Sequence, residues 1–138
     1  MRTSERLLLL VAPAAALASV DLFVKSTVPT ASWAFHHRSG AWMMLCVALL
    51  VGTGFLSLVP SASVAVAGGV MSAGVIGNLV SARADGNWVP NPLIVHRAHF
   101  TVAFNLADVF FLVGNLLLMT TLAAEAVRHR DRLARLRH

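Results

Sequence analysis

One carboxylate lies alone in the last apolar run of the chain. Asp108 is the only charged residue between Phe100 and Ala124, a stretch that is long enough to cross a bilayer. A charged side chain in a membrane costs roughly 2.5 kcal/mol or more, so such a residue is expected to face a cavity and to have a function. Asn105 lies three residues earlier, on the same helix face. The pattern predicts a polar site in which Asp108 is the candidate for acid or base chemistry.

Two more polar clusters end other apolar stretches. Asp21 and Lys25 are four residues apart, which places an acid and a base on one helix face where they can pair. Asn78 follows Gly77 at the end of the third apolar stretch. Because consecutive spans run antiparallel, Asn78 and Asp108 are expected at a similar depth. The three clusters therefore predict one shared site at one end of the molecule.

The elements that position these residues are apolar helices. The chain of 138 residues is 57% hydrophobic and 12% charged, with a mean hydropathy of +0.74, and soluble domains carry about twice that charge. A spanning helix takes about 20 mostly apolar residues. We predict an all-α membrane protein, a four-transmembrane-helix bundle, as a single domain over 1–138. The expected spans and the basic tail are 7–24, 41–60, 62–80, 102–123 and 124–138.

Basic residues set the expected orientation. Arg2 and Arg6 precede the first span, and five arginines between 128 and 137 follow the fourth. Because basic flanks stay in the cytoplasm, both termini are expected there, and the loops 25–40 and 81–101 are expected outside. The tail makes anionic membrane lipid, and not nucleic acid, the expected partner of the net charge of +5.

Four minor features have simpler interpretations. The N-terminal run resembles a secretory signal with a cleavage site at Ala16-Leu17-Ala18, but a retained helix accounts better for the charged residues that follow. Gly69, Ala73 and Gly77 are spaced by four residues and predict a face for close helix packing. The single Cys46 excludes an intrachain disulfide. An interfacial aromatic belt is expected from Trp33, Phe35, Trp42, Trp88 and Phe100.

Together these motifs resemble the lipoprotein signal peptidase (signal peptidase II) family. The resemblance covers nearly the whole chain and rests on the span count, the Asp21/Lys25 pair, the Gly77-Asn78 step and the Phe104-Asn105-Leu106-Ala107-Asp108 motif. It implies a bacterial inner (plasma) membrane location and a small extracytoplasmic β-cradle beside the four helices. It also implies an aspartic endopeptidase that removes signal peptides from diacylglyceryl prolipoproteins, and no cofactor.

The family's chemistry needs two aspartates, and this chain matches one. One carboxylate takes a proton from water while the other, protonated, polarises the scissile carbonyl, and sharing a proton pushes their pKa values apart. Asp108 matches one of them. The other position falls on Pro90 or, with a slip of one residue, on Asn91, and neither side chain can act as a base. Arg38 or a neighbour stands where the family has an asparagine, and Arg83 is one residue late. The resemblance therefore implies a degenerate member, a pseudoenzyme.

Three alternatives would give Asp108 a partner. Asp85 is in the same loop, but it precedes Gly86 in a turn, where an aspartate capping its own backbone is the favoured interpretation. Arg38 could reach Asp108, keep it ionised and remove it from acid/base work. Zinc would need three or four ligands, and solvated side chains without a metal are the favoured interpretation of the outer histidines, His36, His37, His96 and His99.

Two classes of function follow. We favour a non-catalytic protein that binds lipidated or signal-peptide segments, with another membrane protein as a further possible partner. The alternative is an active aspartic endopeptidase that cleaves diacylglyceryl prolipoproteins, and a purely structural membrane subunit comes third. The candidate catalytic residue is Asp108, with Asp85 as the alternative partner. The candidate binding residues are Asp21, Lys25, Arg38, Asn78, Asn91 and Asn105.

Overall fold

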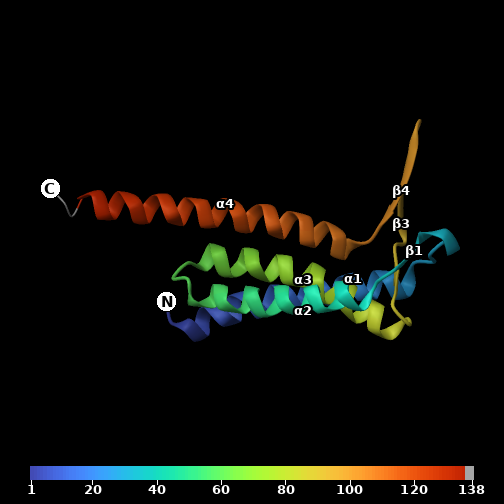
Figure 1. Ribbon diagram of the computed structural model, residues 1–138, viewed down its shortest axis with the longest axis horizontal. Helices are drawn as coiled ribbons and strands as arrows, with labels where there is room; N and C mark the ends of the chain where they lie inside the picture. Colours follow the sequence, from blue (N-terminus) through green and yellow to red (C-terminus); the bar gives the residue numbers. More distant parts are fainter. Residues whose placement is uncertain (136–138) are drawn as a thin grey trace.

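The protein is built mainly from four helices. The structure is a computed structural model that describes residues 1–135. Its helices are α1 (Thr3–Thr27), α2 (Gly40–Gly54), α3 (Ala62–Ala84) and α4 (Leu106–Arg135). Each is long and apolar enough to cross a membrane, α2 together with the short 3₁₀ helix η2 (Phe55–Leu58) that continues it. The prediction of four apolar helices is therefore confirmed, and Figure 1 shows all the strands gathered at one end of them.

The third helix is the centre of the bundle. In the most apolar 18-residue stretch of this helix 67% of the residues are buried, against 17% to 22% in the same stretch of the other three helices. It packs most extensively on α4 and α1 and less on α2. Gly69 lies against the Leu10 carbonyl and the Pro13 side chain, and Gly74 lies against the Ala107 carbonyl, so that an added Cβ at either glycine would collide. Gly69 belongs to the predicted small-residue face and contacts α1, whereas Gly74, which was not part of that prediction, contacts α4.

The end of the bundle opposite the strands is tied by a buried arginine. Arg6 is 8% exposed, and its Nε donates to the carbonyl of Ser57 at 2.7 Å. Its other guanidinium nitrogens donate to the Met1 carbonyl and the Thr3 hydroxyl. Arg6 therefore joins the start of α1 to η2, a structural role that its place among the basic flanking residues did not suggest.

The four strands form two antiparallel pairs. β1 (Phe35–His37) pairs with β2 (Trp88–Pro90), and β3 (Leu93–Arg97) pairs with β4 (Phe100–Phe104). A short 3₁₀ helix, η1 (Ser32–Ala34), precedes β1. The first pair joins the two loops that the sequence placed on one side of the membrane, and the second is a hairpin that projects from the bundle (Figure 1). The small strand region that the resemblance implied is present.

Both ends of the fourth helix differ from the sequence prediction. The fourth helix starts at Leu106 and not at 102, because residues 100–104 form β4, where aromatic and β-branched side chains suit a strand. It also continues to Arg135 instead of ending at 123, so the first part of the expected tail is helical. Apolar residues of a strand and of a span look alike in a hydropathy plot, which explains the first error.

Candidate functional site

Asp108 is part of the cap that starts α4. Its backbone N–H donates to Asn105 Oδ1 at 2.9 Å, and its own Oδ2 accepts from the Asn105 backbone N–H at 3.3 Å. This reciprocal arrangement is a capping box, and it satisfies amides that have no partner within the first turn of a helix. Asp108 therefore helps to build the fold, whatever chemistry it performs.

A chain of polar contacts joins α1, α3 and α4 at this point. Asp21 is fully buried and forms an ion pair with Lys25, with 2.7 Å between Oδ2 and Nζ. Lys25 Nζ donates to Asn78 Oδ1 at 2.9 Å, and Asn78 Nδ2 donates to Asp108 Oδ1 at 2.9 Å. Asp21 Oδ1 also accepts from the Ala107 backbone N–H at 2.8 Å, which places a carboxylate at the positive end of α4. The predicted Asp21–Lys25 pair and the equal depth of Asn78 and Asp108 are confirmed.

Gly77 leaves the space that this contact chain needs. A Cβ at Gly77 would lie 2.5 Å from Asp21 Oδ2 and 3.2 Å from the Ala107 Cβ. Its carbonyl also lies 3.4 Å from Lys25 Nζ and accepts a hydrogen bond from it. Gly77 thus leaves space for the Asp21 carboxylate of α1, and Asn78 links Lys25 of α1 to Asp108 of α4 by hydrogen bonds.

Asn91 lies beside this network at one of the two positions expected for the missing aspartate. It is 1% exposed, and its Oδ1 accepts from Asn105 Nδ2 at 2.5 Å. Its Nδ2 lies 2.6 Å from His36 Nδ1. The neighbouring Pro90 contributes its backbone carbonyl, which lies 3.4 Å from Asn105 Nδ2. Asn91 therefore bonds to the residue that caps Asp108 and not to Asp108 itself.

The backbone of α4 fixes which groups donate and which accept in these hydrogen bonds. The Asp108 backbone N–H can only donate, so Asn105 turns its oxygen to Asp108 and its nitrogen to Asn91. Asn91 must then turn its nitrogen to His36, whose Nδ1 has to accept. His36, although exposed, is the last member of this network, and the interpretation of the outer histidines as solvated side chains missed this contact.

Asp108 and Asn78 open onto a cavity of about 350 Å³ between α2, α3 and α4. Arg38, which precedes α2, reaches the same cavity. The remaining wall is nearly all apolar: Trp42, Leu45, Cys46, Leu49, Gly74, Val75 and Phe111. The sequence did not indicate these wall residues, because an apolar side chain in a span has the same character whether it faces lipid or a cavity.

Arg38 reaches this cavity without an ion pair. Its guanidinium carbon lies 5.0 Å from the centre of the Trp42 ring, a cation–π contact. Its Nε is buried and has no hydrogen-bond partner among residues 1–130. The Arg38–Asp108 ion pair that we considered is absent from that part of the chain. A buried donor without an acceptor costs about 1–3 kcal/mol, so the Arg38 Nε is a donor that the described residues leave unused.

Asp85 is not part of this site. It is the exposed cap residue at the end of α3, where its backbone N–H donates to the Ser81 carbonyl at 2.9 Å. It lines a separate pocket with Lys25. Throughout residues 1–130, the hydrogen bonds to the Asp108 carboxylate come from the amides of Asn78 and Asn105, and no second carboxyl group joins them.

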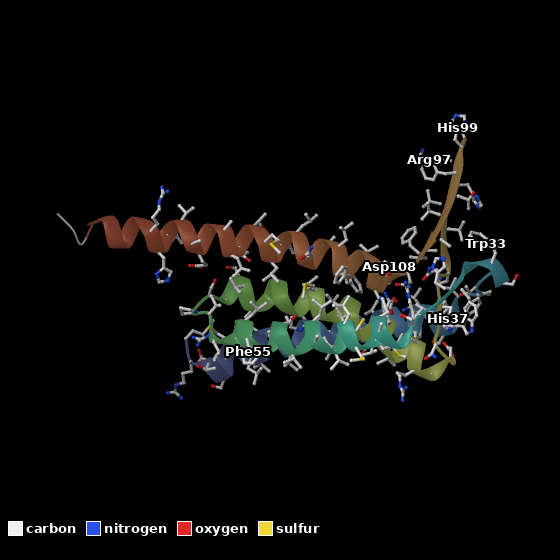
Figure 2. The ribbon with its side chains drawn as sticks, viewed as in Figure 1. Trp33, His37, Phe55, Arg97, His99 and Asp108 are labelled. Atoms are coloured by element: carbon white, nitrogen blue, oxygen red, sulfur yellow. The ribbon has the colours of Figure 1, made fainter. Side chains whose placement is uncertain are left out.

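The other histidines lie away from Asp108. Figure 2 shows His99 and Arg97 at the tip of the β3–β4 hairpin, far from the labelled Asp108, whereas His37 is the last residue of β1. His37 stacks edge-on against Trp88 at 5.1 Å between ring centres, and His96 is within 3.0 Å of the Thr101 hydroxyl. Across the described residues, no three metal-binding side chains come together.

Comparison of the chain with protein-family models, with known proteins and with solved structures finds no match. The chemistry available at the site is therefore that of its own residues. These are one carboxylate held by amides, one arginine with a free donor, and an apolar cavity that both of them line.

Proposed function

We propose that this protein binds a lipidated or signal-peptide segment in the cavity between α2, α3 and α4, without cleaving it. One observation carries the proposal: Asp108 is the one carboxylate among the cavity-lining residues of the described chain. Aspartic hydrolysis needs two carboxyl groups that share a proton, one as base and one as acid. The positions expected for the second hold Pro90 and Asn91, which cannot exchange a proton with water.

The cavity has the properties that such a segment requires. Its volume of about 350 Å³ accommodates a few side chains or an acyl chain, but not a whole helix. An extended backbone in an apolar environment needs partners for its N–H and C=O groups. The Asp108 carboxylate can accept from a backbone N–H, and Arg38 can donate to a carbonyl. The apolar wall then takes the side chains or the lipid.

The proposal places the chain in a bacterial inner membrane with both termini in the cytoplasm. Arg2 and the arginines at the end of α4 flank the spans at one end of the bundle, and basic flanks of this kind stay on the cytoplasmic side. The strands and the cavity mouth with Arg38 then lie at the outer face, where a lipidated precursor would arrive. The partners that follow are membrane lipid, the precursor segment and a membrane protein that receives it.

A binding assay with matched variants tests the proposal. Purified protein in detergent is mixed with a fluorescent diacylglyceryl prolipoprotein peptide, and both binding and cleavage are followed. Leu45→Trp fills the cavity, whereas Val51→Trp adds the same ring to an exposed site of α2 that does not line it. We expect binding without cleavage, a loss of at least about tenfold for Leu45→Trp, corresponding to roughly 1.4 kcal/mol, and no loss for Val51→Trp.

Two results would overturn this assignment. Cleavage by the unaltered protein that disappears in Asp108→Asn would show an active aspartic endopeptidase. Equal binding by Leu45→Trp and Val51→Trp would show that the cavity is not the binding site. Asp108→Asn suits the first test because an asparagine oxygen can still accept from the Asn105 N–H and preserve the cap.

A further inference from the structure

A second hollow lies between α2 and α3, away from Asp108. It is an apolar groove of about 710 Å³, and none of its lining residues lines the Asp108 cavity. The lining residues are Gly40, Met43, Met44, Val47, Ala48, Leu79 and Arg83. The arginine that stands one residue late relative to the family motif therefore lines this groove and not the candidate site.

One end of the groove carries a basic side chain, Arg83. Arg83 is exposed in the last turn of α3, and Gly40 is the first residue of α2, so both lie at the end of the helices that carries the strands. The first turn of a helix adds a partial positive charge. A Cβ built on Gly40 would have no atom within 4 Å, so this end is open. The rest of the groove is apolar.

The length of the groove matches one leaflet of a bilayer. Its wall on α2 runs over the eight residue steps from Gly40 to Ala48, which at 1.5 Å per residue is about 12 Å. Half of the hydrocarbon core of a membrane is about 15 Å thick. A transmembrane helix of a partner would need an apolar face over twice this length. The groove fits a molecule with an acyl chain and an anionic head.

We propose that this groove holds one anionic glycerophospholipid from the leaflet at the strand-bearing end of the bundle. The acyl chain lies along Met43, Met44 and Val47, where unbranched methionine side chains adapt to a flexible ligand. The phosphate lies at Arg83, whose forked donors match phosphate oxygens. This site is separate from the cavity of the proposed function and does not depend on it.

Native mass spectrometry of the purified full-length chain with added dipalmitoyl phosphatidylglycerol tests the proposal. Arg83→Ala removes the charge at the groove, and Arg97→Ala removes the same charge from the exposed hairpin tip. Ala48→Phe fills the groove and leaves the charge unchanged. We expect one retained lipid, bound about fivefold more weakly by Arg83→Ala, unaffected by Arg97→Ala and lost in Ala48→Phe. Glycerol 3-phosphate, which has the head without the chains, should not displace it.

Several outcomes would refute the site. Equal lipid retention by Arg83→Ala and Arg97→Ala would show that Arg83 does not bind the lipid. Lipid retention by Ala48→Phe would show that the lipid does not lie in the groove. Displacement by glycerol 3-phosphate would indicate a phosphate site without an acyl chain. Disulfide dimers formed by Met44→Cys on Cys46→Ser protein, at the lipid concentration that fills the site, would show a second copy in the groove. Circular dichroism of each variant confirms that it is folded.

Discussion

Removing Lys25 should destabilise the protein more than any other single change at the candidate site. The Lys25 side chain is 4% exposed, and it forms the ion pair with Asp21, which is fully buried. Lys25→Met leaves the Asp21 carboxylate buried without a cation, and breaking a buried pair in this way costs about 3–5 kcal/mol. It also removes the donor from Asn78 Oδ1, a hydrogen bond worth about 1 kcal/mol.

A second substitution should recover most of this loss. In Asp21→Asn/Lys25→Met no charge is buried, and the asparagine oxygen can still accept from the Ala107 N–H at the start of α4. The remaining cost is the donor missing at Asn78, so the double variant should be about 1–2 kcal/mol less stable than the unaltered protein. Asp21→Asn alone should be milder than Lys25→Met, because Lys25 keeps the Asn78 and Gly77 oxygens as acceptors.

Thermal unfolding in detergent measures these differences. Cys46 is the single cysteine and is buried, so a maleimide dye that fluoresces on reaction reports its exposure at one known site. Circular dichroism at 222 nm follows helix loss in the same samples. Two results would refute a buried charge as the cause. The first is a free energy of unfolding of Lys25→Met within about 1 kcal/mol of that of the unaltered protein, and the second is a double variant as unstable as Lys25→Met.

Three further predictions follow from the same geometry. Gly77→Ala should cost about 1–3 kcal/mol, because its methyl group meets Asp21, whereas Gly52→Ala, with open space around the new Cβ, should be neutral in the same thermal assay. Asn105→Ala should cost about 1–2 kcal/mol through loss of the α4 cap, and proteolysis near residue 105 should become faster. Arg38→Met should leave the unfolding temperature unchanged or higher, since it removes a donor that has no acceptor, and should weaken binding of the prolipoprotein peptide in a fluorescence titration.

The sequence predicted the structure correctly where a residue pattern fits one arrangement, and less well where the pattern fits two. An acid and a base four residues apart in a helix can hardly avoid each other, and Asp21 and Lys25 do pair. The Asn105–Asp108 spacing predicted a shared face, but the same spacing also encodes a capping box, which the structure shows. Apolar residues are less informative still, since position 102 suits a strand as well as a span and Trp42 suits a cavity wall as well as an interfacial belt.

The role of His36 could not be found by local reasoning. Its contact with Asn91 joins residues 55 positions apart, and it exists because β1 and β2 pair across two loops. Nothing in the spacing of either residue indicates the other. A signal was available in retrospect, since a buried asparagine next to two prolines must find partners for its side-chain amide.

The polar residues of the site have structural roles that do not depend on catalysis. Asp108 caps α4, Asn78 joins α3 to it, and Asp21 with Lys25 secures α1, so each of these residues makes a contact that the fold uses. Asn91, which follows β2, is also tied to the start of α4, because its Oδ1 accepts from Asn105 Nδ2. These contacts hold α1, α3 and α4 together beside the cavity whether or not hydrolysis takes place there.

Asn91→Asp tests whether a second carboxyl group at this position gives cleavage. A new carboxylate at 91 would accept from Asn105 Nδ2 and face His36, because those are the groups that surround the present amide. It would not share a proton with Asp108, so we expect the variant to fold, to bind the prolipoprotein peptide and to leave it uncleaved. Pro90→Asp is the companion variant at the other candidate position. Cleavage by Asn91→Asp that requires Asp108 would show that the loop can bring the two carboxyl groups together, and the non-catalytic assignment would then depend on a single substitution.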